Sequence, residues 1–306
     1  MSELGHKAAI AAPAITASSV RGRPSDYLAL MKPRVMSLVV FTALTGMLVA
    51  PGDIAPARAL AALLFISLGA GASAALNMWY DADIDAVMRR TRKRPIPAGR
   101  LPARDALWFG LGLSAVAVAG LGVVANLAAA ALLALTIGFY ILVYTMWLKR
   151  ATPQNIVIGG AAGALPPMIG WAVATGGVDA GAIALFLIIF LWTPPHFWAL
   201  ALFRNADYAA AGVPMLPVVA GPEETKRQIL LYTLLLVPVT LAPLLFGVGG
   251  LIYVIAAALL GFAFLDRVFR LLAAEEEEAM KRAAGRLFGF SIVYLFALFT
   301  LLLAGA

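Results

Sequence analysis

The sequence predicts an all-α, polytopic membrane protein with about nine transmembrane helices. Of its 306 residues, 62% are hydrophobic and only 13% are charged, and the mean hydropathy is +0.92. Apolar segments recur along the whole chain, too regularly for a soluble insert. If the N-terminus lies in the cytoplasm, every Lys and Arg except Arg58 falls on the cytoplasmic side, and this asymmetry predicts the orientation of the chain.

Composition also excludes several classes of site and partner. Cysteine is absent, so the chain has no disulfide, thiolate metal site or cysteine nucleophile. The net charge of +7 and the isoelectric point of about 9.9 would suit a nucleic-acid partner. Bases gathered on one side of a bilayer, facing membrane lipid, explain this charge better, and no nucleic-acid partner is expected.

Residues 1–30 are expected to form a cytoplasmic, partly disordered tail. They contain Ala, Ser, Pro and scattered bases, without an uninterrupted apolar stretch before a cleavage site, so no signal peptide is predicted. His6 in this tail has no expected role. Residues 31–306 are expected to form a single transmembrane domain, with helices at roughly 35–51, 59–79, 105–124, 127–147, 155–175, 180–200, 229–247, 250–266 and 287–305.

The loops between these helices differ on the two sides of the membrane. The outer loops are short and offer no chemistry, whereas the inner loops are long or charged. The active site is therefore expected to open to the cytoplasmic face. Several predicted helices are rich in Gly and Ala, as at 110–122 and 159–170, and small residues let membrane helices approach closely.

Three polar side chains at helical spacing lie at the end of the second predicted helix and just beyond it. Asn77, Asp81 and Asp85 lie at i, i+4 and i+8, so on a helix they share one face, while Asp83 points elsewhere. Two carboxylates at this spacing repel each other unless a cation lies between them. Hard oxygen ligands of this kind suit Mg²⁺, which prefers one or two carboxylates together with phosphate and water.

Basic residues cluster in two of the inner loops. Seven of them follow the acids between Arg89 and Arg104, and Lys149 and Arg150 end the fourth predicted helix, five residues after Tyr144. One interpretation is that these bases hold the phosphate groups of a substrate. The other is that they are ordinary juxtamembrane bases that obey the positive-inside rule or extend to lipid headgroups.

The third inner region contains the one histidine expected at membrane depth. His196 follows two prolines and lies between aromatic residues, so it is either a buried histidine bonded to a carbonyl or a contact to an iron porphyrin. Arg204 and Asp207 follow, and Asp207 is the natural second metal or phosphate-organising residue. The four acids at 275–278 point around a whole helix, so we expect a solvated face with Glu–Lys and Glu–Arg pairs.

Six segments carry a resemblance to the UbiA superfamily of intramembrane prenyltransferases. NMWYDADIDAVMRRTRKRPIPAGR at 77–100 resembles its first Asn/Asp-rich motif, and YTMWLKRATPQN at 144–155 resembles its Tyr…Lys-Arg motif. Within the superfamily, the chain is most similar to the members that farnesylate haem. That closer resemblance rests on KPRV at 32–35, NIVIGGAAGALPPMIGW at 155–171, WTPPHFWALALFR at 192–204 and DYAAAGVPMLPVV at 207–219.

The resemblance implies farnesyl transfer from farnesyl diphosphate to haem b, with addition of water and release of pyrophosphate, in a bacterial inner membrane. It implies Mg²⁺ as cofactor, bound by Asn77, Asp81 and Asp85. Many relatives carry a second pair of aspartates four residues apart, whereas this chain has Phe203 and Asp207, so Asp207 alone is expected there as a further metal ligand. Pyrophosphate contacts are expected from Lys32, Arg90, Arg94, Lys149, Arg150 and Arg204.

Other roles and functions remain open at this point. His196 is the candidate haem contact, and haem A synthase or oxidase assembly factors are candidate protein partners by pathway logic. A prenyltransferase that acts on an aromatic quinone precursor is the nearest alternative function. A transporter or lipid-binding membrane protein is the alternative from another class, but transporters place polar residues near mid-membrane rather than at one face.

Overall fold

The computed structural model describes residues 22–305, and this range is helical apart from its turns and loops. The first half of the described chain holds ten helical elements of very different length. The elements are α1 (Pro24–Leu30), α2 (Pro33–Val49), α3 (Pro56–Tyr80), α4 (Ala82–Val87), α5 (Ala103–Val124), α6 (Leu127–Gly138), the π-helix η1 (Phe139–Leu148), α7 (Lys149–Ala151), α8 (Asn155–Ala164) and α9 (Pro166–Thr175).

The second half begins with α10, which stays helical through Pro194 and Pro195. The elements are α10 (Ala180–Phe203), α11 (Asn205–Ala210), α12 (Leu216–Val219), α13 (Gly221–Val239), the 3-10 helix η2 (Ala242–Phe246), α14 (Leu251–Leu272) and α15 (Glu277–Ala304). In the described range, eight continuous spans are long and apolar enough to cross a membrane. The bent pair α1–α2, at 52°, makes a ninth if it counts as one span, which agrees with the predicted number.

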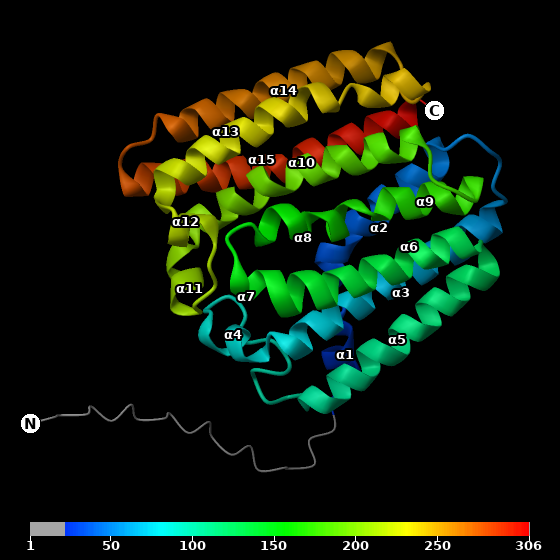
Figure 1. Cartoon of the computed structure of the whole chain (residues 1–306), viewed down its shortest axis with the longest axis horizontal. Helices are drawn as coiled ribbons and strands as arrows, with labels where there is room; N and C mark the ends of the chain where they lie inside the picture. The colour runs from blue at the N-terminus through cyan, green and yellow to red at the C-terminus, as the bar shows by residue number, and fades with distance from the viewer. Residues whose placement is uncertain (1–21, 306) are drawn as a thin grey trace, which may run out of the picture.

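The spans form a closed ring in which each packs on its neighbour. The order of contact is α2, α3, α5, α6–η1, α8, α10, α13, α14 and α15, and α15 returns to α2. Figure 1 shows that α4, α7, α11 and α12 gather at one end of this bundle. We call this end the polar end, and the site described below lies there.

The crossing of α2 and α9 shows why small residues recur in this chain. A Cβ atom on Gly46 would lie 2.1 Å from the carbonyl oxygen of Pro167, and one on Gly170 would lie 1.9 Å from that of Ala43. Real Cβ atoms do not approach so closely, so the two backbones meet only because both positions lack a side chain. The expected role of glycine in close helix packing is confirmed here.

Three helix ends differ from the sequence prediction. Helix α13 begins at Gly221 rather than 229, α14 continues to Leu272 rather than 266, and α15 begins at Glu277 rather than 287. The predicted bounds followed hydropathy, but these helices continue beyond their apolar parts through turns that carry charged residues. Lys281 pairs with Glu277 at 2.7 Å and with Glu278 at 3.1 Å, which confirms the predicted solvated face.

Part of the segment assigned to the N-terminal tail packs on the bundle. Residues 24–30 form α1, whose Leu30 is fully buried. Asp26 in the same helix pairs with Arg100 at 2.8 Å. The expected tail role of residues 1–21, with His6, lies outside the described residues.

Candidate active site

The predicted acidic face forms where α3 meets α4. Asp81 joins the two helices, and its N–H donates to the Asn77 carbonyl at 2.9 Å, while the Asp85 N–H donates to the Asp81 carbonyl at 2.8 Å. The i to i+4 register therefore continues across the junction, and all three residues are buried. Asp83 points away, with its side chain 65% exposed. The expected arrangement of the four residues is confirmed.

Both buried carboxylates are paired with bases, one from a distant span and one from the adjoining loop. Lys149 Nζ donates to Asp81 Oδ2 from the end of the η1–α7 span. Arg94 Nη1 donates to Asp85 Oδ2 at 2.5 Å from the loop that follows α4. Removing one partner from such a buried pair leaves an uncompensated charge. The Lys149–Asp81 pair also joins the first predicted motif to the second.

A further base reaches the site from the elbow between α1 and α2. Lys32 Nζ donates to Asn77 Oδ1 at 2.9 Å. Its backbone has φ 50° and ψ 54°, and it is the only non-glycine residue in 22–305 with positive φ. Non-glycine residues rarely adopt this left-handed conformation, and those that do cluster at functional sites.

Arg150 lies between two carboxylates at the outer edge of the cluster. It forms a bidentate pair with Asp83, in which both N–O distances are 2.8 Å. Its Nη2 also donates to the Tyr80 carbonyl at 3.2 Å and lies 3.8 Å from Asp81 Oδ1. That Oδ1 atom is buried and has no hydrogen-bond partner within residues 22–305.

The donor set fits Mg²⁺. Within the described part of the chain, no three His, Cys, Asp or Glu side chains come together as a metal site, so the protein offers at most two carboxylates here. Magnesium uses one or two carboxylates and completes its shell with phosphate and water. The unpartnered Oδ1 of Asp81 is a buried anionic oxygen free to bind such a cation.

A π-helical segment contributes residues that the sequence analysis missed. The hydroxyl of Thr145 donates to the Tyr140 carbonyl at 2.8 Å and accepts from Asn77 Nδ2 at 3.2 Å. Tyr140 and Tyr144 stack with ring centroids 5.3 Å apart. Segments of π-helix are frequent at functional sites, but the uniformly apolar run FYILVYTMWL carries no periodic signal that would reveal one.

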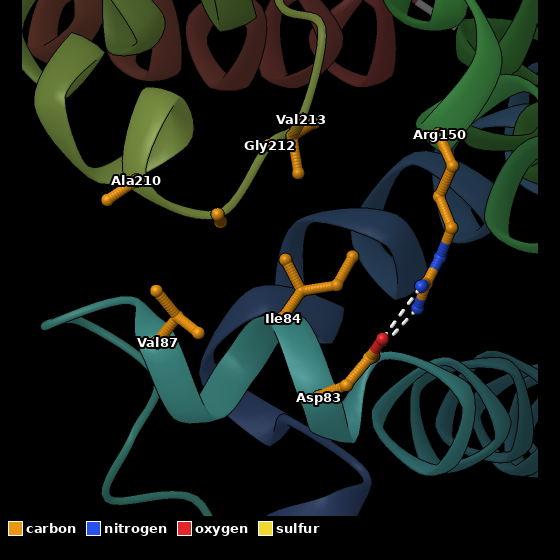
Figure 2. Close-up of a pocket in the computed structure, with 8 residues that line it drawn as sticks. Asp83, Ile84, Val87, Arg150, Ala210, Gly212 and Val213 are labelled. Atoms are coloured by element: carbon orange, nitrogen blue, oxygen red, sulfur yellow. Dashed lines mark hydrogen bonds and ion pairs between the residues drawn. The ribbon is translucent and has the colours of Figure 1, made fainter. Parts of the chain in front are cut away.

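The segment after α10 meets the first motif at the polar end. A cavity of about 310 Å³ lies between α4 and residues 210–213, with Asp83 and Arg150 at its edge. Figure 2 shows Ile84 and Val87 of α4 facing Ala210, Gly212 and Val213 across it. Burial raises the pKa of Tyr208, while its neighbours Arg90 and Arg94 act in the opposite direction.

Four predicted site residues lie apart from this cluster. No side-chain hydrogen bond or ion pair within 22–305 joins Arg90, Arg204, Asp207 or His196 to it. The structure thus brings part of the predicted set into direct contact and leaves the rest on neighbouring elements. The residues in contact are Lys32, Asn77, Asp81, Asp85, Arg94, Lys149 and Arg150.

His196 occupies an aromatic pocket between α10 and α15. Its ring stacks on Trp192 at 4.3 Å and on Phe288 at 4.6 Å, and Nδ1 lies 2.7 Å from Ser291 Oγ. The Ser291 hydroxyl donates to the Phe288 carbonyl at 2.7 Å. With the Ser291 hydroxyl assigned as donor to that carbonyl, its oxygen accepts from His196, and in this tautomer Nδ1 carries the proton and Nε2 presents a lone pair. No hydrogen-bond partner of Nε2 occurs among residues 22–305.

Comparison with known proteins finds relatives that match most of this chain. A protoheme IX farnesyltransferase of Parvibaculum lavamentivorans is 63% identical over 92% of this chain and 89% of its own length. One from Azorhizobium caulinodans is 58% identical over 95% and 94%. A digeranylgeranylglyceryl phosphate synthase structure shares the fold with a TM-score of 0.75 at 17% identity, covering 92% of this chain and 97% of its own.

A second solved structure shares the same architecture. It is a UbiA homologue from Archaeoglobus fulgidus bound to DMAPP and Mg²⁺, with a TM-score of 0.65 and 19% identity, and it covers 90% of this chain and 99% of its own. At these identities the structures show the fold alone. The model of the UbiA prenyltransferase family matches residues 39–304. The chain therefore belongs to the UbiA prenyltransferase family.

Proposed function

We propose that this protein transfers a farnesyl group from farnesyl diphosphate to a vinyl group of haem b, with addition of water, giving haem O and pyrophosphate. The observation that carries the proposal is the buried pair of carboxylates surrounded by more bases than it can neutralise. Asp81 and Asp85 pair with Lys149 and Arg94. Asp83 pairs with Arg150, and Lys32 donates to the neutral Asn77, so four bases meet three carboxylates. The excess of positive charge suits a diphosphate.

The bases have a direct role in the chemistry. Ionisation of an allylic diphosphate leaves a carbocation and a pyrophosphate anion, and Lys32, Arg94 and Lys149 stabilise the charge that develops on the leaving group. Mg²⁺, when bound to Asp81, Asp85 and Asn77, supplies further neutralisation of that group. The UbiA homologue from Archaeoglobus fulgidus, bound to DMAPP and Mg²⁺, supports this assignment by analogy.

The apolar bundle has two tasks in this reaction. It accommodates a fifteen-carbon tail, and it keeps water from the carbocation until a haem vinyl carbon has attacked. Aromatic faces stabilise a cation electrostatically. The stacked pair Tyr140–Tyr144 is placed for this, because Tyr140 lies close enough to Asp81, Asp85 and Arg94 to experience their charges.

The acceptor is inferred from the relatives and from His196. Relatives at 58–63% identity are named protoheme IX farnesyltransferase. In the pocket of His196, the free Nε2 and the flat faces of Trp192 and Phe288 suit a porphyrin. Arg204 and Asp207 are proposed to complete the site from the same side when substrate binds.

The setting of the reaction is part of the proposal. The bases gather at the polar end, so this end is proposed to face the cytoplasm of a bacterial inner membrane, with the tail on the same side and residues 31–306 as one domain. Haem O would serve haem A and terminal oxidase biogenesis, and haem A synthase or oxidase assembly factors are the proposed recipients.

The test uses purified protein in detergent with haem b, farnesyl diphosphate and Mg²⁺. The expected product is haem with its mass increased by farnesyl plus water, and EDTA should abolish its formation. Release of pyrophosphate without modified haem would keep the prenyltransferase and replace the acceptor, with an aromatic quinone precursor tested next. Folded protein that binds haem and farnesyl diphosphate but releases no pyrophosphate would contradict the proposal.

A further inference from the structure

Asp83 differs from the other carboxylates of the site. Asp81 and Asp85 are buried and paired with Lys149 and Arg94, whereas the Asp83 side chain is 65% exposed and has Arg150 as its partner. The Asp83–Arg150 pair is bidentate, with both N–O distances at 2.8 Å. The proposed reaction leaves this paired carboxylate without a task.

Arg150 is held off the centre of the site by this pair. Its Nη2 is 2.8 Å from Asp83 Oδ1 but 3.8 Å from the unpartnered Oδ1 of Asp81. Its guanidinium also lies over the Tyr80 ring, 4.8 Å from the centroid. The Arg150 side chain is 34% exposed and lies at the edge of the cavity beside α4 (Figure 2). An inward shift of its guanidinium would therefore bring it toward the buried carboxylate of Asp81.

We propose that Asp83 is a positioning residue that competes with the diphosphate for Arg150: it holds the guanidinium at the rim in the empty site and takes it back as pyrophosphate leaves. This inference rests on the proposed function, since it assumes that Arg150 binds a diphosphate. It adds a role in product release for a carboxylate that binds neither metal nor substrate.

The magnitudes allow such an exchange. An exposed ion pair contributes little, because water screens it, whereas a diphosphate carries several charges and pairs of oxygens that accept bidentate hydrogen bonds from the guanidinium. The diphosphate therefore displaces Asp83 when it binds.

The test measures the affinity of full-length protein in detergent for magnesium pyrophosphate by calorimetry, together with KM and kcat for farnesyl diphosphate. Asp83→Asn removes the charge and preserves the shape. We expect pyrophosphate to bind about two- to fivefold more tightly and KM to fall by a similar factor. Asp83→Glu, which keeps the charge, should restore the wild-type values. Asp266→Asn, which removes a comparable pair with Arg270 at 2.8 Å on α14, should change neither.

A second variant separates this inference from the proposed function. Arg150→Gln should weaken pyrophosphate binding, and adding Asp83→Asn to it should have no further effect, because the competing pair no longer exists. If Asp83→Asn weakens binding or leaves it unchanged while Arg150→Gln weakens it, the exchange is wrong and the proposed function stands. If Asp81→Asn, Lys149→Met and Arg150→Gln all leave pyrophosphate binding intact, the proposed function fails as well.

Discussion

Thr145 accepts a hydrogen bond from Nδ2 of Asn77 at 3.2 Å, although 68 positions separate the two residues. The proton of the Thr145 hydroxyl is already donated to the Tyr140 carbonyl, so its oxygen can only accept. This fixes the amide of Asn77, with Nδ2 toward Thr145 and Asp81 and with Oδ1 toward Lys32. The π-helix that places Thr145 here thereby orients a proposed metal ligand.

Replacement of Thr145 by Val should therefore weaken the use of Mg²⁺. The variant keeps the shape of the side chain but loses the acceptor, so the Asn77 amide keeps only its bonds to Asp81 and Lys32 and is held less firmly. We expect the Mg²⁺ concentration for half-maximal activity to rise about tenfold or more, as is usual when a group that orients a metal ligand is removed. Titrating Mg²⁺ into the prenyl-transfer assay measures this concentration. Thr145→Ser, which keeps the hydroxyl, should show the wild-type value.

Thr233→Val is the matched control. Thr233 is fully buried, as Thr145 is, and its hydroxyl donates to the Ile229 carbonyl at 2.7 Å, but it does not contact the site. It should lower stability by a similar amount and leave the Mg²⁺ requirement unchanged. An equal rise in that requirement in both variants would show that buried threonines act here only through stability.

The sequence was sufficient to predict the acidic face but not the contacts of the π-helix. Asn77, Asp81 and Asp85 follow a fixed spacing, and helical geometry alone puts them on one side. Thr145 lies in a run of apolar and aromatic residues, where neither hydropathy nor periodicity distinguishes a π-helix from an α-helix. The partner of Asn77 comes from tertiary packing, which a single sequence does not encode in any local pattern.

The ends of a helix were predictable only where its apolar stretch and the helix end at the same residue. Hydropathy marks the part of a helix that faces lipid, whereas α13 begins eight residues earlier, with charged residues in its first turns. Lys226 in that extension is 2% exposed, and its Nζ donates to Glu223 at 2.7 Å and to the Ala274 carbonyl at 2.8 Å. Contacts of this kind stabilise a polar helix start and cannot be read from composition.

Asp81→Asn should abolish turnover while the protein stays folded in the membrane. The variant keeps the side-chain volume but removes the charge that faces Lys149 and the proposed Mg²⁺, and we expect a loss of about 100-fold or more in pyrophosphate release. Asp53→Asn, on an exposed loop at the other end of the bundle, is the control and should retain full rate. Near-normal haem O formation by Asp81→Asn would refute the metal assignment.

His196→Ala should weaken haem binding more than binding of farnesyl diphosphate. Its Nε2 presents the free lone pair of the aromatic pocket, whereas no contact joins it to the acidic cluster in the described residues. Absorbance titration with haem measures the first affinity, and calorimetry with a non-hydrolysable farnesyl diphosphate analogue measures the second. Ser291→Ala removes the hydrogen-bond partner of His196 Nδ1 and should also weaken haem binding, but by less.

An unchanged haem spectrum and affinity in both variants would assign His196 to packing alone. The stacks with Trp192 and Phe288 would then be its whole contribution, as in a buried histidine bonded to one hydroxyl. Reduced thermal stability with unchanged haem affinity is the expected result in that case, because a cavity would remain between α10 and α15.

The crossing of α2 and α9 predicts that replacing two glycines of the same span by alanine affects protein stability differently. Gly170→Ala would put a Cβ atom 1.9 Å from the Ala43 carbonyl oxygen, so the backbones must separate, whereas a Cβ atom on Gly163 meets no atom within 4 Å. We expect Gly170→Ala to lower the free energy of unfolding by about 1–3 kcal/mol and Gly163→Ala to leave it nearly unchanged. Thermal unfolding in detergent compares the stability of the two variants. Both substitutions add the same methyl group to a helix, so Gly163→Ala is the matched control. Equal stability of the two variants would mean that the helices at this crossing are less tightly packed than the backbone distances imply.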